Sequence, residues 1–180
     1  LAFRNNKEDE LSTRAEYWAK HILTVDLNEL NSKSSSTGFI YSPSSFSKVI
    51  SEISKLNEIS IIFLSATSLG KDLAGRIAVR TDSSVFNDCI DVKIENGNLI
   101  ASRPVYAGKS ITLIKANSDK LVLTLRPNVF KPVKSDGGSI ETEKVDIDTL
   151  NLSDSDFSSK VKEVAVSSEK LDVAEADRIV

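Results

Sequence analysis

The stretch ISIIFLSATSLGKDLAGRIAVRTDSSVFNDCIDV, residues 59–92, decides the fold of this chain. It begins with a short run of β-branched and aromatic residues at 59–64. That length and composition predict a strand covered on both faces, as in a parallel sheet. A small, polar, glycine-containing turn follows at 65–72, and residues 73–78 then repeat apolar side chains at helical spacing. The pattern predicts a strand, a tight turn, a helix entered through Gly70 and Lys71, and a second strand.

The chain before this stretch shows the same alternation of strand and helix. Residues 21–26 have the composition of a strand, and residues 7–20 have apolar positions at helical spacing. Residues 27–38 are expected to form a loop. Ser42 followed by Pro43 predicts the start of a helix, because serine caps helices well and proline suits the first helical position. This order predicts an α/β fold with a mainly parallel sheet and right-handed crossovers.

The second half of the chain changes to an alternation typical of antiparallel strands. Asn96-Gly97 is a strong type I′ hairpin turn between the alternating residues 89–95 and residues 98–102. Two more strands are expected at residues 110–116 and 120–126. We expect these segments to form an antiparallel β section added to the parallel core.

The last part of the chain is acidic and then weakly alternating. The acidic side chains of residues 141–156 predict a solvated linker or the edge strand of a sheet. Val145, Ile147 and Leu150 remain available to pair or pack there. Residues 161–166 are expected to form a last strand.

Composition limits the classes of protein to which the chain can belong. At 180 residues it suits one domain, and a net charge of −3 leaves no basic face for nucleic acid. No apolar run approaches the roughly 18 residues of a membrane span, so no membrane insertion is expected. One cysteine, Cys89, and one histidine, His21, support neither an internal disulfide nor a metal site. The expected compartment is the cytosol of a prokaryote or an organelle matrix of a eukaryote.

The turn at residues 65–72 carries the candidate site, because ligands of open α/β sheets bind where strand ends meet helix starts. It lacks the first glycine of a P-loop and has Asp72 in place of the Ser or Thr that would hold magnesium. No dinucleotide fingerprint and no catalytic motif occur in the chain, so no catalytic residue and no metal ligand are predicted. A helix start can nevertheless receive an anion. The predicted anion or nucleotide ligands are Thr67, Ser68, Gly70 and Lys71.

Lys71 is the least expected of these residues. A cation in the first turn of a helix opposes the macrodipole, and a broken local rule can mark a functional position. The alternative interpretation is a solvated lysine beside Asp72.

Several segments resemble the electron transfer flavoprotein alpha subunit, in the order and at the spacing of that family. They cover about two-thirds of the chain. The segments are ATSLGKDLAGR at 66–76, FND at 86–88, RPVYAGK at 103–109, LRPNVF at 125–130 and LDVAEADRIV at 171–180.

The resemblance implies a Rossmann-like layered fold with an added antiparallel sheet. It also implies a heterodimer with a beta-type subunit that carries electrons through FAD between flavin dehydrogenases and an acceptor. FAD would be held mainly by a carboxyl-terminal domain, so residues 1–180 are expected to form a single amino-terminal domain without that domain. The protein would act as an electron carrier rather than a catalyst.

The chain departs from the family at both ends. It stops at Val180, before the glycine-rich flavin segment, and it is short before His21. It would therefore be either a trimmed alpha subunit or a shortened relative. Two further hypotheses remain open, namely a stand-alone nucleotide- or anion-binding protein and a scaffold without a ligand.

Overall fold

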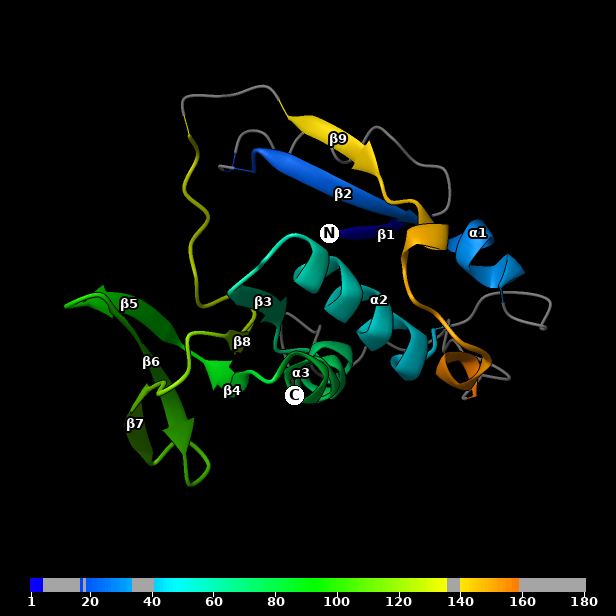
Figure 1. The fold of residues 1–180 in the computed structure, drawn as a ribbon. Helices are drawn as coiled ribbons and strands as arrows, with labels where there is room; N and C mark the ends of the chain where they lie inside the picture. Colours follow the sequence, from blue (N-terminus) through cyan, green and yellow to red (C-terminus); the bar gives the residue numbers. More distant parts are fainter. Residues whose placement is uncertain (5–16, 18, 34–40, 136–139, 159–180) are drawn as a thin grey trace, which may run out of the picture.

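The computed structural model describes residues 1–4, 17, 19–33, 41–135 and 140–158. Within these ranges the strands form three three-stranded sheets, in the orders β1-β2-β9, β3-β8-β4 and β5-β6-β7. The first two sheets are parallel and the third is antiparallel. Figure 1 shows α2 between the β1-β2-β9 sheet and α3, with the strands of the other two sheets to the left of these helices. The α/β class, with mainly parallel sheets and an added antiparallel sheet, is confirmed.

The central parallel sheet is built around β8, Leu121–Leu125. This strand pairs with β3, Ile61–Ser65, on one side and with β4, Ser84–Cys89, on the other. The prediction that residues 120–126 belong to the antiparallel section was therefore wrong. The sequence LVLTL suits the centre of a parallel sheet, because such a strand is covered on both faces and can be apolar throughout.

Strand β3 lies at the edge of its sheet, paired only with β8 among the described residues. Its alternate side chains Ile61 and Phe63 remain 39% and 51% exposed. The prediction that residues 59–64 form a strand covered on both faces was wrong in this respect. The apolar run indicated the strand but not its place in the sheet.

Helix α3, Ser68–Thr81, covers one face of the central sheet and packs against α2, Pro43–Leu56. The expected apolar residues of α3 are buried there. Helix α2 begins at Pro43, as the Ser-Pro pair predicted. Its Phe46 and Ile50 join the cluster around Ile77, whereas its Val49 and Ile53 join the core of the first sheet. Helix α2 therefore connects the two parallel sheets through their hydrophobic cores.

The first sheet consists of β1, Ala2–Arg4, β2, His21–Asp26, and β9, Glu141–Lys144. The strand expected at residues 21–26 is confirmed, and the acidic β9 lies at an exposed sheet edge. After β2 the chain forms α1, Leu27–Ser32, where a loop was predicted. The cause is local, because the Asp26 carboxylate accepts hydrogen bonds from the N–H groups that begin this helix.

Two short 3₁₀ helices close the described part of the chain. They are η2, Ile147–Thr149, and η3, Asp154–Phe157. Ile147 and Leu150 pack into the core of the first sheet, as their apolar character allowed. The helix expected at residues 7–20 lies almost wholly outside the described residues, and the strand expected at 161–166 lies wholly outside them.

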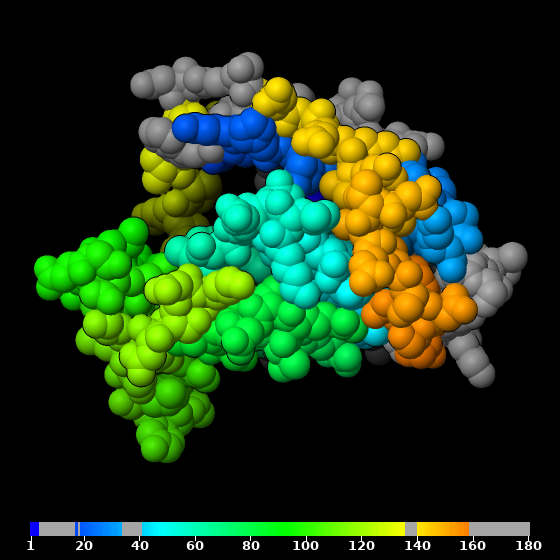
Figure 2. All heavy atoms as spheres, viewed as in Figure 1, coloured from blue at the N-terminus to red at the C-terminus, as the bar shows by residue number. Residues whose placement is uncertain are grey.

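The antiparallel sheet consists of β5, Asp91–Glu95, β6, Asn98–Val105, and β7, Ser110–Lys115. The Asn96-Gly97 turn joins β5 to β6 with both residues at positive φ, as predicted. One face of this sheet packs through Ala101 and Ile114 on the core of β4 and β8. Figure 2 shows the sheet, in green at the left, projecting beyond the helical part of the molecule. No helix in the described residues is long and apolar enough to span a membrane.

Candidate functional site

The predicted turn folds as a capped helix start. Thr67 is the N-cap of α3, and its Oγ1 accepts a hydrogen bond from the N–H of Gly70 at 3.2 Å. The helix thus begins at Ser68, earlier than an entry through Gly70. The structure brings Thr67 and Gly70 together, whereas the side chains of Ser68 and Lys71 are exposed.

Gly70 is required by packing between the strand and the helix. A Cβ placed on it would lie 1.9 Å from the carbonyl oxygen of Ser65. The space beside this glycine is therefore filled by the protein's own backbone and offers no cradle for a phosphate. Binding of an anion or nucleotide by Thr67, Ser68, Gly70 and Lys71 stays a prediction.

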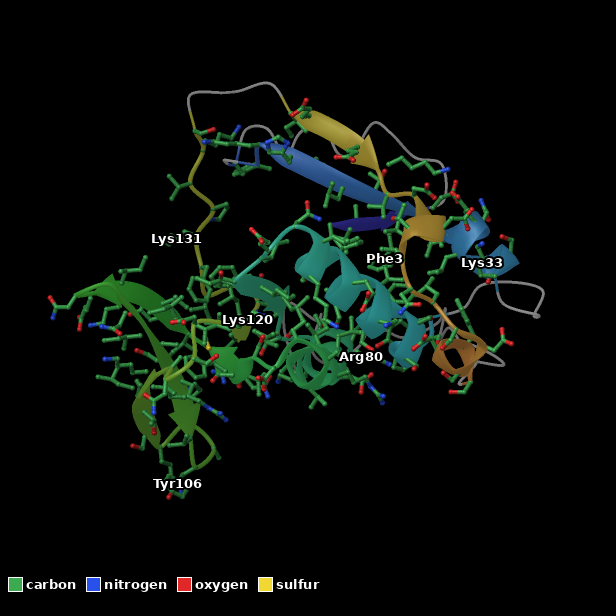
Figure 3. The ribbon with its side chains drawn as sticks, viewed as in Figure 1. Phe3, Lys33, Arg80, Tyr106, Lys120 and Lys131 are labelled. Atoms are coloured by element: carbon green, nitrogen blue, oxygen red, sulfur yellow. The ribbon has the colours of Figure 1, made fainter. Side chains whose placement is uncertain are left out.

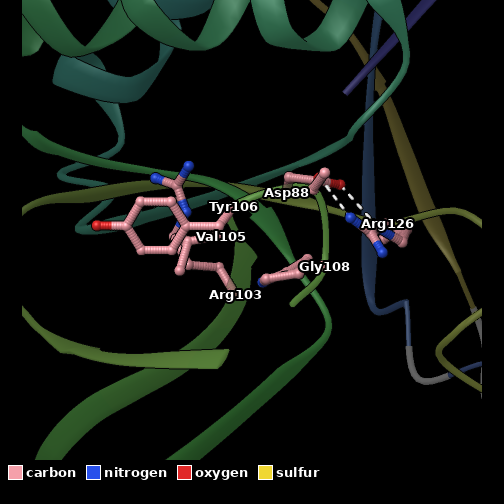
Figure 4. Close-up of a pocket in the computed structure, with 8 residues that line it drawn as sticks. Asp88, Arg103, Val105, Tyr106, Gly108 and Arg126 are labelled. Carbon is pink, nitrogen blue, oxygen red and sulfur yellow. Dashed lines mark hydrogen bonds and ion pairs between the residues drawn. The ribbon is translucent and has the colours of Figure 1, made fainter. Parts of the chain in front are cut away.

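A pocket of about 450 Å³ lies elsewhere, where β4, the β6–β7 turn and the end of β8 meet. Three of the motifs that carried the family resemblance contribute to it. Its lining residues are Asp88, Arg103, Pro104, Val105, Tyr106, Ala107, Gly108 and Arg126. In Figure 4, Arg103 and Tyr106 stand on one side of this pocket and the Asp88–Arg126 pair on the other.

Asp88 reaches the pocket because β4 is irregular at this point. The pairing of β4 with β8 shifts register between Phe86 and Cys89, and Asp88 adopts a left-handed backbone with φ of 63°. Its N–H donates to Thr124 Oγ1 at 2.8 Å. Irregularities of this kind often redirect a side chain near a site.

The Asp88 carboxylate is held by two charge-assisted hydrogen bonds. Arg126 donates from Nε to Oδ1 at 3.0 Å and from Nη2 to Oδ2 at 2.6 Å. These bonds lower the pKa of Asp88 below its usual range, against a smaller opposing effect of burial. The positive charges of Lys71, Arg126 and Arg103 lower the same pKa further. Lys71 thus acts electrostatically on the pocket although it is not among the residues that line it.

We expect Asp88→Asn to make the free energy of unfolding less dependent on pH under acidic conditions. A carboxylate with a depressed folded-state pKa contributes stability that is fully present above its ordinary pKa of 3.8. That contribution is lost as the pH falls through the lower folded-state pKa. Asparagine tolerates the left-handed backbone, so the variant removes the charge without new strain. Urea unfolding from neutral to strongly acidic pH measures the difference.

The exposed Asp91, three residues further along, provides the matched control for this prediction. The difference in free energy of unfolding between wild type and Asp88→Asn should shrink with acidification, while Asp91→Asn should follow wild type. A constant difference at all pH values would contradict the role assigned to the Asp88 carboxylate.

The turn between β6 and β7 forms another wall of the pocket. Tyr106, Ala107 and Gly108 all have positive φ, at 53°, 54° and 85°. The N–H of Gly108 donates to the carbonyl of Val105 at 3.1 Å, and the Tyr106 side chain is 81% exposed. Figure 3 shows Tyr106 at the far tip of the antiparallel sheet. An exposed aromatic ring on a strained turn is typical of a contact surface.

The remaining reactive side chains have structural roles. Cys89 is fully buried, and burial raises the pKa of its thiol. His21 is exposed and lies 3.2 Å from a carboxylate oxygen of Glu141 on the neighbouring strand. Within the described ranges, no three His, Cys, Asp or Glu side chains gather as a metal site would require.

None of Asp88, Arg103, Tyr106 and Arg126 was predicted from the sequence as a site residue. The family motifs contain all four residues, so the sequence did mark them as part of the family pattern. Their convergence depends on the pairing of distant strands, which no motif specifies.

Comparison with known protein families decides the affiliation of the chain. The profile of the Electron transfer flavoprotein domain matches residues 15–155. The chain belongs to the electron transfer flavoprotein family. Protein FixB of Clostridium saccharobutylicum is 33% identical over 170 residues, which make up 92% of this chain and 48% of that protein.

Relatives named electron transfer flavoprotein subunit alpha agree with this result. The protein of Clostridium acetobutylicum is 29% identical over 180 residues, covering 98% of this chain and 51% of the relative. That of Bacillus subtilis is 29% identical over 169 residues, covering 91% of this chain and 47% of the relative. The resemblance to the alpha subunit is thereby confirmed. The chain spans about half the length of these curated relatives.

Flavin is implied by the family, but the described residues do not form a site that fits FAD. The glycine of the strand-to-helix turn faces the backbone of Ser65 rather than open space. The pocket at Asp88 is lined by three charged side chains and by the turn at residues 105–108, without the apolar slot that an isoalloxazine ring requires.

Proposed function

We propose that this chain is the structural and partner-binding domain of an electron transfer flavoprotein alpha subunit. The family match over residues 15–155 carries the proposal. In this function the domain supports FAD-mediated electron transfer between flavin dehydrogenases and an acceptor, and it catalyses nothing itself. The match favours this function over a stand-alone nucleotide- or anion-binding relative.

The proposal places FAD in a separate carboxyl-terminal domain, outside residues 1–180. The coverage of about half of each relative supports this division. An absorbance spectrum of the purified 180-residue chain tests it, because bound flavin absorbs visible light. A stoichiometric flavin spectrum from this chain alone would overturn the division. The predicted compartment, the cytosol or an organelle matrix, rests on the same affiliation.

The proposed partner is a beta-type subunit, docked on the outward face of the antiparallel sheet. On β7, Ile111 and Leu113 are 61% and 65% exposed. Ile111 pairs with Pro104 across the sheet, so the two side chains share that outer face. Ile114, one residue further, points inward to the core of β4 and β8. An exposed apolar strip of this kind on a rigid sheet is typical of a protein–protein contact.

We expect the double variant Ile111→Asp, Leu113→Asp to weaken binding of a beta-type subunit at least tenfold. Charges at the centre of an apolar contact must be desolvated without a partner, which costs about 1.4 kcal/mol or more. Isothermal titration calorimetry with the beta-type subunit of the same organism measures the affinity.

The matched control is Val79→Asp, which places a charge on an even more exposed apolar position of α3. Its affinity should equal that of wild type. Equal affinity of all three proteins would place the contact elsewhere and contradict the docking face. Failure of the unaltered chain to bind any beta-type subunit would contradict the proposed function itself.

A further inference from the structure

The pocket at Asp88 contains a hydrogen-bond donor that lacks an acceptor. The Nε atom of Arg103 is buried and has no hydrogen-bond partner among the described residues. An unsatisfied buried donor of a charged group is costly, so native structures rarely leave one without a reason. The Arg103 side chain lines the pocket, which suggests that its partner is a bound group rather than part of the chain.

The nearby carboxylate of Asp88 does not accept a hydrogen bond from Arg103 Nε in the structure. Both oxygens of Asp88 are engaged by Arg126, at 3.0 and 2.6 Å. Lys71, Arg103 and Arg126 act on this one carboxylate, so the region retains an excess of positive charge. A ligand that completes the site must therefore carry negative charge.

We propose that this pocket binds an oxyanion, a carboxylate or a phosphate group, through the guanidinium of Arg103. The edge of a guanidinium formed by Nε and one Nη donates two parallel hydrogen bonds to such a group. The Asp88–Arg126 ion pair forms the wall of the pocket that lies opposite Arg103. The site goes beyond the proposed redox function and does not depend on it.

The ring of Tyr106 lines the same pocket as Arg103. It stands beside the Arg103 side chain in Figure 4 and is almost fully exposed, so packing does not hold it in place. In the proposed complex this ring offers a flat apolar surface beside the anion. With a volume of about 450 Å³, the pocket has room for the rest of a small molecule or for an acidic side chain of another protein.

The test is a titration of the ¹⁵N-labelled 180-residue chain with inorganic phosphate and, separately, with acetate, at constant ionic strength. The expected result is a saturable shift of the backbone N–H signals of Tyr106 and Gly108 with at least one of the two anions. Saturation by phosphate alone indicates a phosphorylated ligand. Saturation by acetate alone indicates a carboxylate, and saturation by both anions indicates a site that accepts either oxyanion.

Two variants and a control show whether Arg103 is the donor. Arg103→Gln should weaken binding at least tenfold, and Arg103→Lys should do nearly the same because it retains the charge but lacks the planar fork. Lys109→Gln removes an equal charge from the same turn outside the pocket lining and should change affinity less than twofold.

Three results would overturn the proposal. The first is the absence of saturable shifts at these signals with both anions. The second is equal weakening by the Arg103 variants and by Lys109→Gln, which would indicate general charge attraction. The third is unchanged binding in Arg103→Lys, which serves as the decisive variant if Arg103→Gln does not fold.

Discussion

Replacement of Gly70 by alanine should lower the free energy of unfolding by about 3 kcal/mol, the upper end of the cost of overpacking. The added Cβ would lie 1.9 Å from the oxygen and 3.1 Å from the carbon of the Ser65 carbonyl. Ser65 ends β3 and Gly70 lies in the first turn of α3, so relief of the clash requires the strand and the helix to move apart. The helix propensity of alanine returns only about 1 kcal/mol. The clash therefore dominates.

Gly75 is the matched control, because it lies in the same helix and a Cβ there would meet no atom within 4 Å. Gly75→Ala should stabilise the protein by about 0.5–1 kcal/mol through the reduced entropy of the unfolded chain. Urea unfolding of both variants gives the two free energies. Equal effects of the two substitutions would show that the approach of Ser65 to Gly70 does not constrain this turn.

The features that the sequence predicted correctly are those determined within a few residues. The Asn96-Gly97 turn follows from the ease with which both residues adopt positive φ, and the structure has them at 50° and 74°. The start of α2 follows from a serine before a proline. The capping role of Asp26 is equally local, yet the polar run after it led to the prediction of a loop instead of α1.

The features that the sequence did not predict depend on the pairing of distant strands. The segment LVLTL shows that β8 is buried, but not that it lies between β3 and β4. The position of β3 at a sheet edge, with Phe63 half exposed, is not visible in its composition either. The pocket residues Asp88, Arg103 and Arg126 come from three such strands or their ends. The motifs identified the family, and only the fold placed these motifs around one pocket.

Replacement of Leu123 by alanine should cost about 3–4 kcal/mol in the free energy of unfolding. Leu123 is fully buried at the centre of β8 and pairs in register with Phe63 of β3 and Phe86 of β4. It also belongs to the core that holds the antiparallel sheet against the parallel one. Truncation there leaves a cavity that neither neighbouring strand can fill without breaking its own pairing. Chemical denaturation followed by circular dichroism measures the loss.

The control for this prediction is Leu113→Ala on the exposed face of β7, which should change the free energy of unfolding by less than about 0.5 kcal/mol. Leu113 lies in the strip proposed to receive a beta-type subunit, so its truncation should weaken docking while the domain remains stable. Leu123→Ala should show the opposite pattern, with an unstable domain whose folded fraction still binds. A stability loss at Leu113 as large as that at Leu123 would mean that the strip is part of the core. If Leu113→Ala left both the stability of the domain and its affinity for the beta-type subunit unchanged, the contact would be confined to Ile111 and its neighbours.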